Sequence, residues 1–134
     1  SNLNSEIWEL EHHYPPYEPY YMNDVLFNDT DFFEIFSPDQ GSGYGHLTSL
    51  DLSVNKISDK GAIAIATSPY LSNLKKLDLF NNQISPKGLE ALLQSKTLVS
   101  LEKLDVVKNN IDIESAVKLK KASSLSKLKA LVAF

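Results

Sequence analysis

The sequence predicts an α/β solenoid in which short parallel strands alternate with helices. Three observations support this prediction: a 27-residue internal repeat, a strand-like leucine pattern in the first half of each unit, and a helix-like apolar face in the second half. With 134 residues and a hydrophobic content of 43%, the chain is long enough for one core and short for two domains.

The repeat is visible as three aligned segments. LTSLDLSVNKI begins at Leu47, LKKLDLFNNQI at Leu74 and LEKLDVVKNNI at Leu101, and a partial unit, LKALVAF, begins at Leu128. Each unit starts 27 residues after the previous one. We therefore predict a repeat domain over residues 47–134, with one strand near the start of each unit.

The second half of each unit contains helix signals. Ser58, Ser85 and Asp112 stand where an N-cap belongs, and Pro86 occupies the favoured first helical position. Apolar residues then recur at i, i+3 and i+4, on one helix face: Ala62, Ile65, Ala66, Leu89, Leu92, Leu93, Ala116 and Leu119. Such faces and the strand leucines can bury each other only when neighbouring units stack.

The consensus L-x-x-L-x-L-x-x-N in these segments resembles the leucine-rich repeat. The 27-residue period, with glycine opening the helical half of two units, is most similar to the ribonuclease-inhibitor-like class of that family. The resemblance covers residues 47–134. It implies a leucine-rich-repeat solenoid with parallel strands on the concave face and helices on the convex face. It also implies that the repeated Asn55, Asn82 and Asn109 point inward and satisfy backbone groups.

Residues 1–46 differ in composition from the repeats. They contain nine of the 17 acidic residues, ten of the 13 aromatic residues and none of the 13 lysines. Their formal charge is −9, against +5 for the repeats. Counting back one period from the first clear unit gives Tyr20, which opens a degenerate unit that aligns Asp24 with Asp51. We therefore predict an acidic, aromatic N-terminal arm followed by a degenerate first repeat or cap.

The sequence lacks the residues of most enzyme and cofactor sites. There is no Cys, which excludes thiol catalysis and Cys-based zinc sites. We find no phosphate-binding glycine loop, zinc-protease helix or serine-nucleophile motif. The lysines are scattered and Arg is absent, which argues against a nucleic-acid partner. No apolar run is as long as the stretch of about 18 residues that is needed to span a membrane. We expect no catalysis, no cofactor, no metal, no nucleic acid and no membrane.

Candidate binding residues align in columns on the predicted concave face. Aspartates recur at one strand position, lysines lie two residues earlier, and an apolar column follows two residues later, because alternate residues of a strand share a face. The candidate site consists of Asp51, Asp78, Asp105, Lys76, Lys103, Lys108, Phe80, Val107 and Phe134. Exposed aromatic side chains surrounded by polar groups are typical of interface hot spots.

Three interpretations of the aspartate column stay open. It is a family-typical feature, an anionic strip for a partner, or a metal or catalytic cluster. The adjacent lysines and the access of water argue against the third. For the apolar column, the alternative to a binding patch is that the N-terminal arm or an end cap covers it.

These patterns predict a non-catalytic module that binds another protein. The resemblance further implies that the partner is an enzyme, which the concave face would inhibit by covering its active site. The alternative is an adaptor that holds one protein on the repeats and a second on the acidic arm. The composition, rich in Lys and Asn, is similar to that of short translocated effectors of bacterial pathogens such as Legionella. A protein of this type is expected in the cytoplasm, and in the host cytoplasm if it is translocated.

Overall fold

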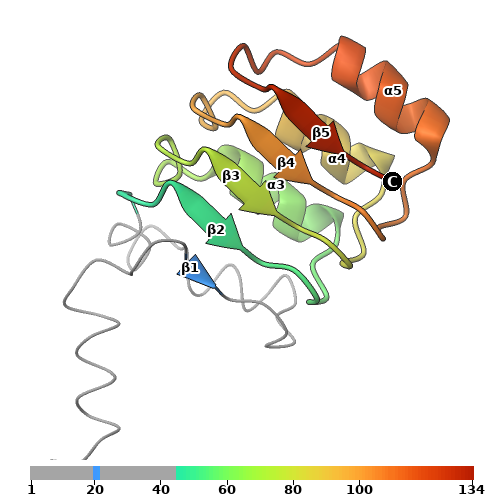
Figure 1. The fold of residues 1–134 in the computed structure, drawn as a ribbon, viewed down its shortest axis with the longest axis horizontal. Helices are drawn as coiled ribbons and strands as arrows, with labels where there is room; N and C mark the ends of the chain where they lie inside the picture. The colour runs from blue at the N-terminus through green and yellow to red at the C-terminus, as the bar shows by residue number, and fades with distance from the viewer. Residues whose placement is uncertain (1–19, 22–44) are drawn as a thin grey trace, which may run out of the picture.

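The computed structural model describes residues 20–21 and 45–134, in which short strands and helices alternate (Figure 1). The elements are β1 (Tyr20–Tyr21), β2 (Ser49–Asp51), α3 (Asp59–Thr67), β3 (Lys76–Asp78), α4 (Pro86–Leu93), β4 (Lys103–Asp105), α5 (Ile113–Lys121) and β5 (Ala130–Val132). The strands form one parallel sheet in sequence order. This arrangement confirms the predicted α/β repeat architecture.

The strand register repeats without slippage from β2 to β5. Equivalent leucines pair at each step: Leu50 with Leu77, Leu77 with Leu104, and Leu104 with Leu131. The ladder continues past the assigned strands, since the N–H of Leu52 donates to the carbonyl of Asp78 over 2.8 Å. This register confirms the 27-residue step, including the partial unit that begins at Leu128.

Strand β1 corrects the predicted register of the first repeat. A 27-residue step would align Asp24 with Asp51, but the structure pairs Tyr21 with Asp51, a step of 30 residues. The degenerate unit lacks Leu and Ile at two positions where the clear units have them, so the hydrophobic pattern that fixes register is weak there. The other predictions for the N-terminal arm fall on residues 1–19 and 22–44, outside the described residues.

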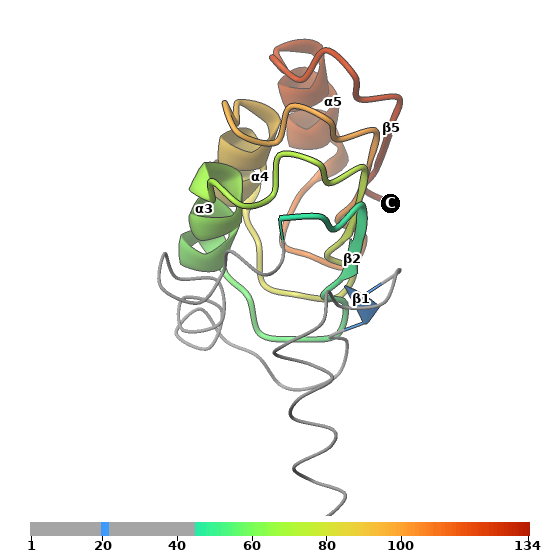
Figure 2. The ribbon, with the colours of Figure 1, turned by 90° about the vertical axis from the view of Figure 1, so that its left-hand side faces the viewer.

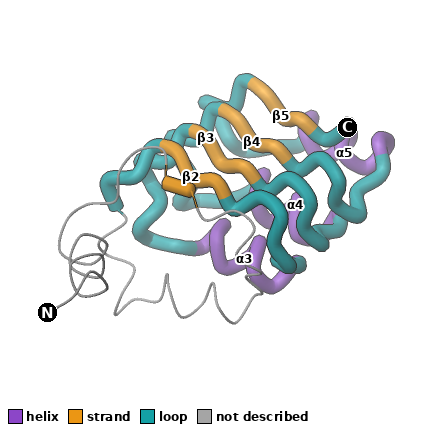
Figure 3. The backbone as a smooth tube through the Cα atoms, turned by 60° about the horizontal axis from the view of Figure 1, so that its bottom comes forward, coloured by secondary structure: helices purple, strands orange, loops and turns teal. Residues whose placement is uncertain are grey.

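The three helices lie on one side of the sheet (Figure 2), and loops close each unit around a shared core (Figure 3). The residues between the two layers are almost fully buried: Leu50, Leu52, Leu77, Leu79, Leu104 and Val106 from the strand segments, and Ala62, Ile65, Ala66, Leu89, Leu92, Leu93 and Ala116 from the helices. Burying one Leu or Ile side chain contributes about 1.5–3 kcal/mol. Stacking of strand leucines on helix faces is therefore a main source of stability, as the sequence predicts.

The repeated asparagines are structural, as predicted. Asn82 is buried and joins two units. Its Oδ1 accepts the N–H of Ile57 over 3.0 Å, and its Nδ2 donates to the carbonyls of Leu52 (3.0 Å) and Leu79 (3.1 Å). Asn109 makes the equivalent bonds one unit later. These amides pair backbone groups that would otherwise be buried without a partner.

The helices begin where the sequence predicts. Ser58, Ser85 and Asp112 are the N-caps of α3, α4 and α5, and Pro86 is the first residue of α4. The side chains of Ser85 and Asp112 accept capping hydrogen bonds, whereas the side chain of Ser58 makes no capping bond.

One carboxylate holds the start of α4 against α3. Asp59, the first residue of α3, accepts hydrogen bonds from the N–H of Ser85 (2.8 Å), the hydroxyl of Ser85 and the N–H of Gly88 (3.1 Å). There is no room for a side chain at Gly88, because an added Cβ would overlap Asp59 Oδ1 and lie 2.8 Å from Ile84 Cγ2. The glycine that opens the helical half therefore allows neighbouring helices to pack closely.

Candidate functional site

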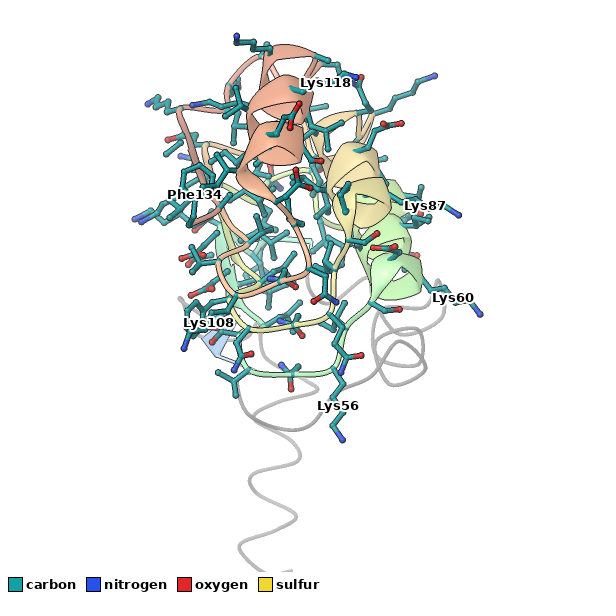
Figure 4. The ribbon with its side chains drawn as sticks, turned by 90° about the vertical axis from the view of Figure 1, so that its right-hand side faces the viewer. Lys56, Lys60, Lys87, Lys108, Lys118 and Phe134 are labelled. Atoms are coloured by element: carbon teal, nitrogen blue, oxygen red, sulfur yellow. The ribbon has the colours of Figure 1, made fainter. Side chains whose placement is uncertain are left out.

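The sheet side opposite the helices, here named the strand face, contains the predicted site. Alternation along β3 and β4 turns the central leucines toward the helices and the flanking residues away from them. Leu77 is 2% exposed, whereas its neighbour Lys76 is exposed and Asp78 is half-buried. Figure 4 shows Lys108 and Phe134 on the strand side of the molecule and Lys60 and Lys87 on the helix side.

Three columns of equivalent residues cross the strand face from β2 to β5. The first column is Ser49, Lys76, Lys103 and Ala130, and the second is Asp51, Asp78, Asp105 and Val132. The third column, two residues further along each unit, is Ser53, Phe80, Val107 and Phe134. Adjacent strands are about 4.8 Å apart. The lysines and two of the aspartates therefore lie on β3 and β4, and β5 contributes only apolar residues.

Local hydrogen bonds fix the aspartate column. In each unit, Oδ1 of the aspartate accepts the backbone N–H two residues later over 2.9 Å: Ser53 to Asp51, Phe80 to Asp78, and Val107 to Asp105. All three aspartates are half-buried. Each carboxylate is thus held in place by one oxygen, while the other makes no hydrogen bond within the described residues.

The central aspartate has a perturbed pKa. Burial raises the pKa of Asp78, and the charges of Asp51 and Asp105 raise it further, while the hydrogen bond from Phe80 and the charge of Lys103 lower it. The net shift is upward. Burial and the like charges of Asp51 and Asp105 therefore outweigh the stabilisation that Phe80 and Lys103 give to the charged form of Asp78.

A hollow of about 210 Å³ opens on the strand face. It brings together five residues of the predicted site, Asp51, Asp78, Asp105, Lys76 and Lys103. Ser49, Leu50 and Leu77 complete its lining. The hollow thus combines three carboxylates and two ammonium groups, which suits polar recognition of a charged partner surface.

Among the residues that the structure describes, the lysines of the first column have no carboxylate partner. Within residues 20–21 and 45–134, the one ion pair joins Lys129 to Glu102 over 3.5 Å. Lys76 and Lys103 are exposed. Their ammonium groups are therefore available for contact with another molecule.

The third column is less exposed than predicted. The sequence pattern predicts an outward Phe80, but its side chain is half-buried and the Nζ of Lys108 lies 5.7 Å from its ring centroid, within cation–π range. The chain turns at Lys108, which has a left-handed φ of 58°. Val107 is also half-buried, whereas Phe134 is 67% exposed. Of the predicted apolar column, Phe134 is therefore exposed, whereas Phe80 and Val107 are only partly so.

Sequence reasoning missed three members of the strand face: Ser49 on β2, and Ala130 and Val132 on β5. The 27-residue period already aligns Ala130 with Lys103 and Val132 with Asp105. Extending the columns to the partial unit would have found the apolar strand.

The described part of the chain contains no group of three or more His, Asp or Glu side chains arranged to hold a metal ion. Among the same residues, no helix has the length and apolar character needed to cross a membrane.

The period and the geometry agree with a comparison to known families. A family model described as Leucine Rich repeat matches residues 46–66 and 70–93, which contain β2, β3, α4 and all but the last residue of α3. Residues 46–93 contain two leucine-rich repeats. The match supports the interpretation of the chain as a leucine-rich-repeat protein. A comparison with curated proteins gave no match. Leucine-rich-repeat domains generally mediate protein–protein interaction and are typically non-catalytic.

Proposed function

We propose that the chain binds a partner protein through the strand face, as the concave surface of a short solenoid of the ribonuclease-inhibitor-like class. The grid of three columns on β2 to β5 is the observation that supports this proposal most directly. It combines fixed carboxylates, lysines that have no carboxylate partner among the described residues, and a 67% exposed Phe134 on one face. Apolar anchors surrounded by polar groups are typical of binding hot spots.

The described helix side offers no comparable grid. The large exposed apolar side chains of the helices themselves are Ile63 on α3 and Ile113 and Val117 on α5. They are separated by α4, which exposes Lys87 and Glu90. Exposed apolar side chains that do not form a large patch are normal on protein surfaces. The strand face is therefore the better candidate for specific recognition.

The sharper form of the proposal is inhibition of a partner enzyme. A protein that covers the mouth of an active site blocks substrate entry without supplying any catalytic group. The fixed aspartates support this mode, because a preorganised surface loses little conformational entropy on binding.

A binding titration tests the assignment of the face. The full chain is used to capture a partner from the native host, and purified variants are then titrated against that partner. We expect Phe134→Ala and Phe80→Ala each to weaken the complex by about 2 kcal/mol or more, the scale of a hot spot. Lys87→Ala and Glu90→Ala on α4 are the matched controls and should leave the affinity unchanged. Silent Phe134 and Phe80 variants alongside a damaging α4 variant would reject the strand face.

A second candidate function is an adaptor. The observation that favours it is the division of charge, −9 in residues 1–46 against +5 in residues 47–134. In this mode the acidic arm recruits a second protein while the repeats hold the first. An enzyme that keeps full activity in the captured complex would favour the adaptor, and an enzyme that loses activity would favour the inhibitor.

The Lys- and Asn-rich composition supports one further proposal about location. A chain with 13 lysines and no Arg is similar in composition to translocated bacterial effectors. We therefore propose that it acts in the cytoplasm of a host cell. A translocation assay with a reporter fused to the full chain tests this placement, and retention of the fusion in the producing bacterium would contradict it.

A further inference from the structure

The order of side chains along the strand face is the same on two neighbouring strands. On β3 the order is Lys76, Asp78 and then Phe80, and on β4 it is Lys103, Asp105 and then Val107. Each order runs cation, anion, apolar in the direction of the chain. Because β3 and β4 are parallel and in register, each lysine lies beside a lysine and each aspartate beside an aspartate, so both strands present the same order of charges.

The side chains in this order also differ in length and freedom. Lys76 and Lys103 are long and exposed, whereas Asp78 and Asp105 are short, half-buried and fixed by backbone hydrogen bonds. A short acidic side chain of a partner can reach the lysines, while only a long basic one can reach the aspartates. A partner backbone that runs at a constant height above β3 and β4 satisfies both requirements.

We propose that the occupant of the strand face is an extended segment of the partner protein that lies along β3 and β4. Its alternate residues are acidic over the lysines, basic over the aspartates and apolar over Phe80 and Val107. This inference rests on the proposed function and specifies the chemistry of the same site. An extended segment fits because side chains on one of its faces recur every two residues, about 6.4–6.8 Å apart. This is the spacing of equivalent side chains along β3 and β4.

The charges of the grid argue against a partner segment of one sign. A wholly acidic segment would face the aspartates, and a wholly basic one would face the lysines; like charges in contact are destabilising. Asp78 lies between Asp51 and Asp105 in the aspartate column. A basic side chain placed at its free oxygen would compensate the negative charge of this column.

NMR titration of the isotope-labelled full chain with defined peptides tests the inference. The matched peptide contains Glu-Ser-Arg-Ser-Phe, its reversed form covers the opposite chain direction, and a permuted peptide of the same composition contains Arg-Ser-Glu-Ser-Phe. We expect one direction of the matched peptide to shift the amides of residues 76–80 and 103–107 with a Kd at least about tenfold lower than that of the permuted peptide, a difference of about 1.4 kcal/mol.

Two variants make the test specific. Asp78→Asn keeps an oxygen that can accept the N–H of Phe80 but removes the charge, so the preference for the matched peptide should fall at least about threefold, or about 0.65 kcal/mol. Lys87→Ala, on the helix side, should leave the preference unchanged.

Each other outcome has a definite meaning. Equal binding of matched and permuted peptides on residues 76–80 and 103–107 would overturn the proposed order and leave the proposed function standing. Shifts confined to α3, α4 and α5 would overturn both. An absence of shifts at millimolar peptide would overturn the extended-segment occupant, and the titration of Phe134→Ala against the captured partner would then decide the proposed function separately.

Discussion

The second and third repeats share a sequence pattern but differ in how deeply they are buried. Ile84, Leu92 and Leu98 of the second repeat are 0% exposed, and their equivalents one period later, Ile111, Leu119 and Leu125, are only partly buried. Helix α4 buries four residues, whereas α5 buries Ala116 alone. Equivalent positions therefore contribute differently to stability, because α4 packs between α3 and α5, whereas α5 packs against α4 alone among the described helices.

The two helix–helix contacts also differ. Asp59 of α3 binds the start of α4 through Ser85 and Gly88. One period later the equivalent of Asp59 is Pro86, which has no carboxylate, and the equivalent of Gly88 is Ser115. The period sets the order of elements, and the residues at the helix starts set how tightly two neighbouring helices are joined.

Replacing a core leucine of the helix by alanine should show the largest difference in stability between the two repeats. Leu92→Ala removes a fully buried side chain, so we expect a loss of about 2–5 kcal/mol in the free energy of unfolding. Leu119→Ala removes a partly buried one and should cost less than about half as much, since less apolar surface returns to water. Urea unfolding of the full chain measures both. Equal costs would show that the third repeat is as well packed as the second.

Substitution of the repeated asparagines should have the next largest effect on the free energy of unfolding. Asn82→Ala leaves the N–H of Ile57 and the carbonyls of Leu52 and Leu79 short of a partner, and we expect a loss of about 1–3 kcal/mol. Asn109→Ala should cost less, because Asn109 is more exposed and water can replace its bonds. Partner affinity of folded molecules should stay the same for both. A loss of affinity without a change in urea midpoint would assign these asparagines to binding.

Substitution at the tight helix contact should have a smaller net effect. Gly88→Ala gains about 1 kcal/mol of helix propensity, but its Cβ would overlap Asp59 and Ile84, and such overpacking costs about 1–3 kcal/mol. We expect a net destabilisation of about 1 kcal/mol. At the equivalent position of the third repeat, Ser115 already carries a Cβ, and the equivalent of Asp59 there is Pro86, which has no carboxylate to overlap.

A double-mutant cycle with Asp59→Ala separates overlap from a general helix effect. In that background the overlapped oxygen is absent, so Gly88→Ala should become less costly. The same cost in both backgrounds would mean that the contact with Asp59 does not limit the space at Gly88.

The fold of residues 47–134 could be predicted closely because one physical pattern fixes each part of it. The period fixes the register through Leu50, Leu77 and Leu104, and the capping residues fix where the helices begin. The register around Tyr21 could not be predicted, because the degenerate unit offers too few core leucines to distinguish a step of 27 residues from one of 30.

The sequence could predict which candidate residues share the strand face, but not how exposed each of them is. Alternation places Lys76 and Asp78 on one face from sequence alone, and the structure confirms that they line one hollow. Exposure depends on neighbours that no periodicity encodes. Phe80 lies close to Lys108 from the next unit, whereas Phe134, at the equivalent position of the partial unit, is largely exposed.

The smallest predicted effects concern two aspartates whose pKa values shift in opposite directions. Hydrogen bonds from the side chain and backbone of Ser115 lower the pKa of Asp112, so its charged form stabilises the fold at neutral pH. That contribution is lost as pH falls from the unfolded value through the lower folded one. Burial raises the pKa of Asp78, so its charge opposes folding at neutral pH, and protonation relieves this as pH falls through the raised value.

Asparagine at each position removes the charge and keeps a hydrogen-bond acceptor. At about pH 7, Asp78→Asn should therefore raise the free energy of unfolding and Asp112→Asn should lower it. Both differences from the unsubstituted chain should shrink at about pH 3, where the aspartates take up protons. Urea unfolding at the two pH values measures the four differences. Both effects should be small, because water screens Asp112 fully and Asp78 in part. If Asp78→Asn instead destabilised the chain at neutral pH, its charge would be compensated within the strand face, and the need for a basic side chain from the partner would disappear.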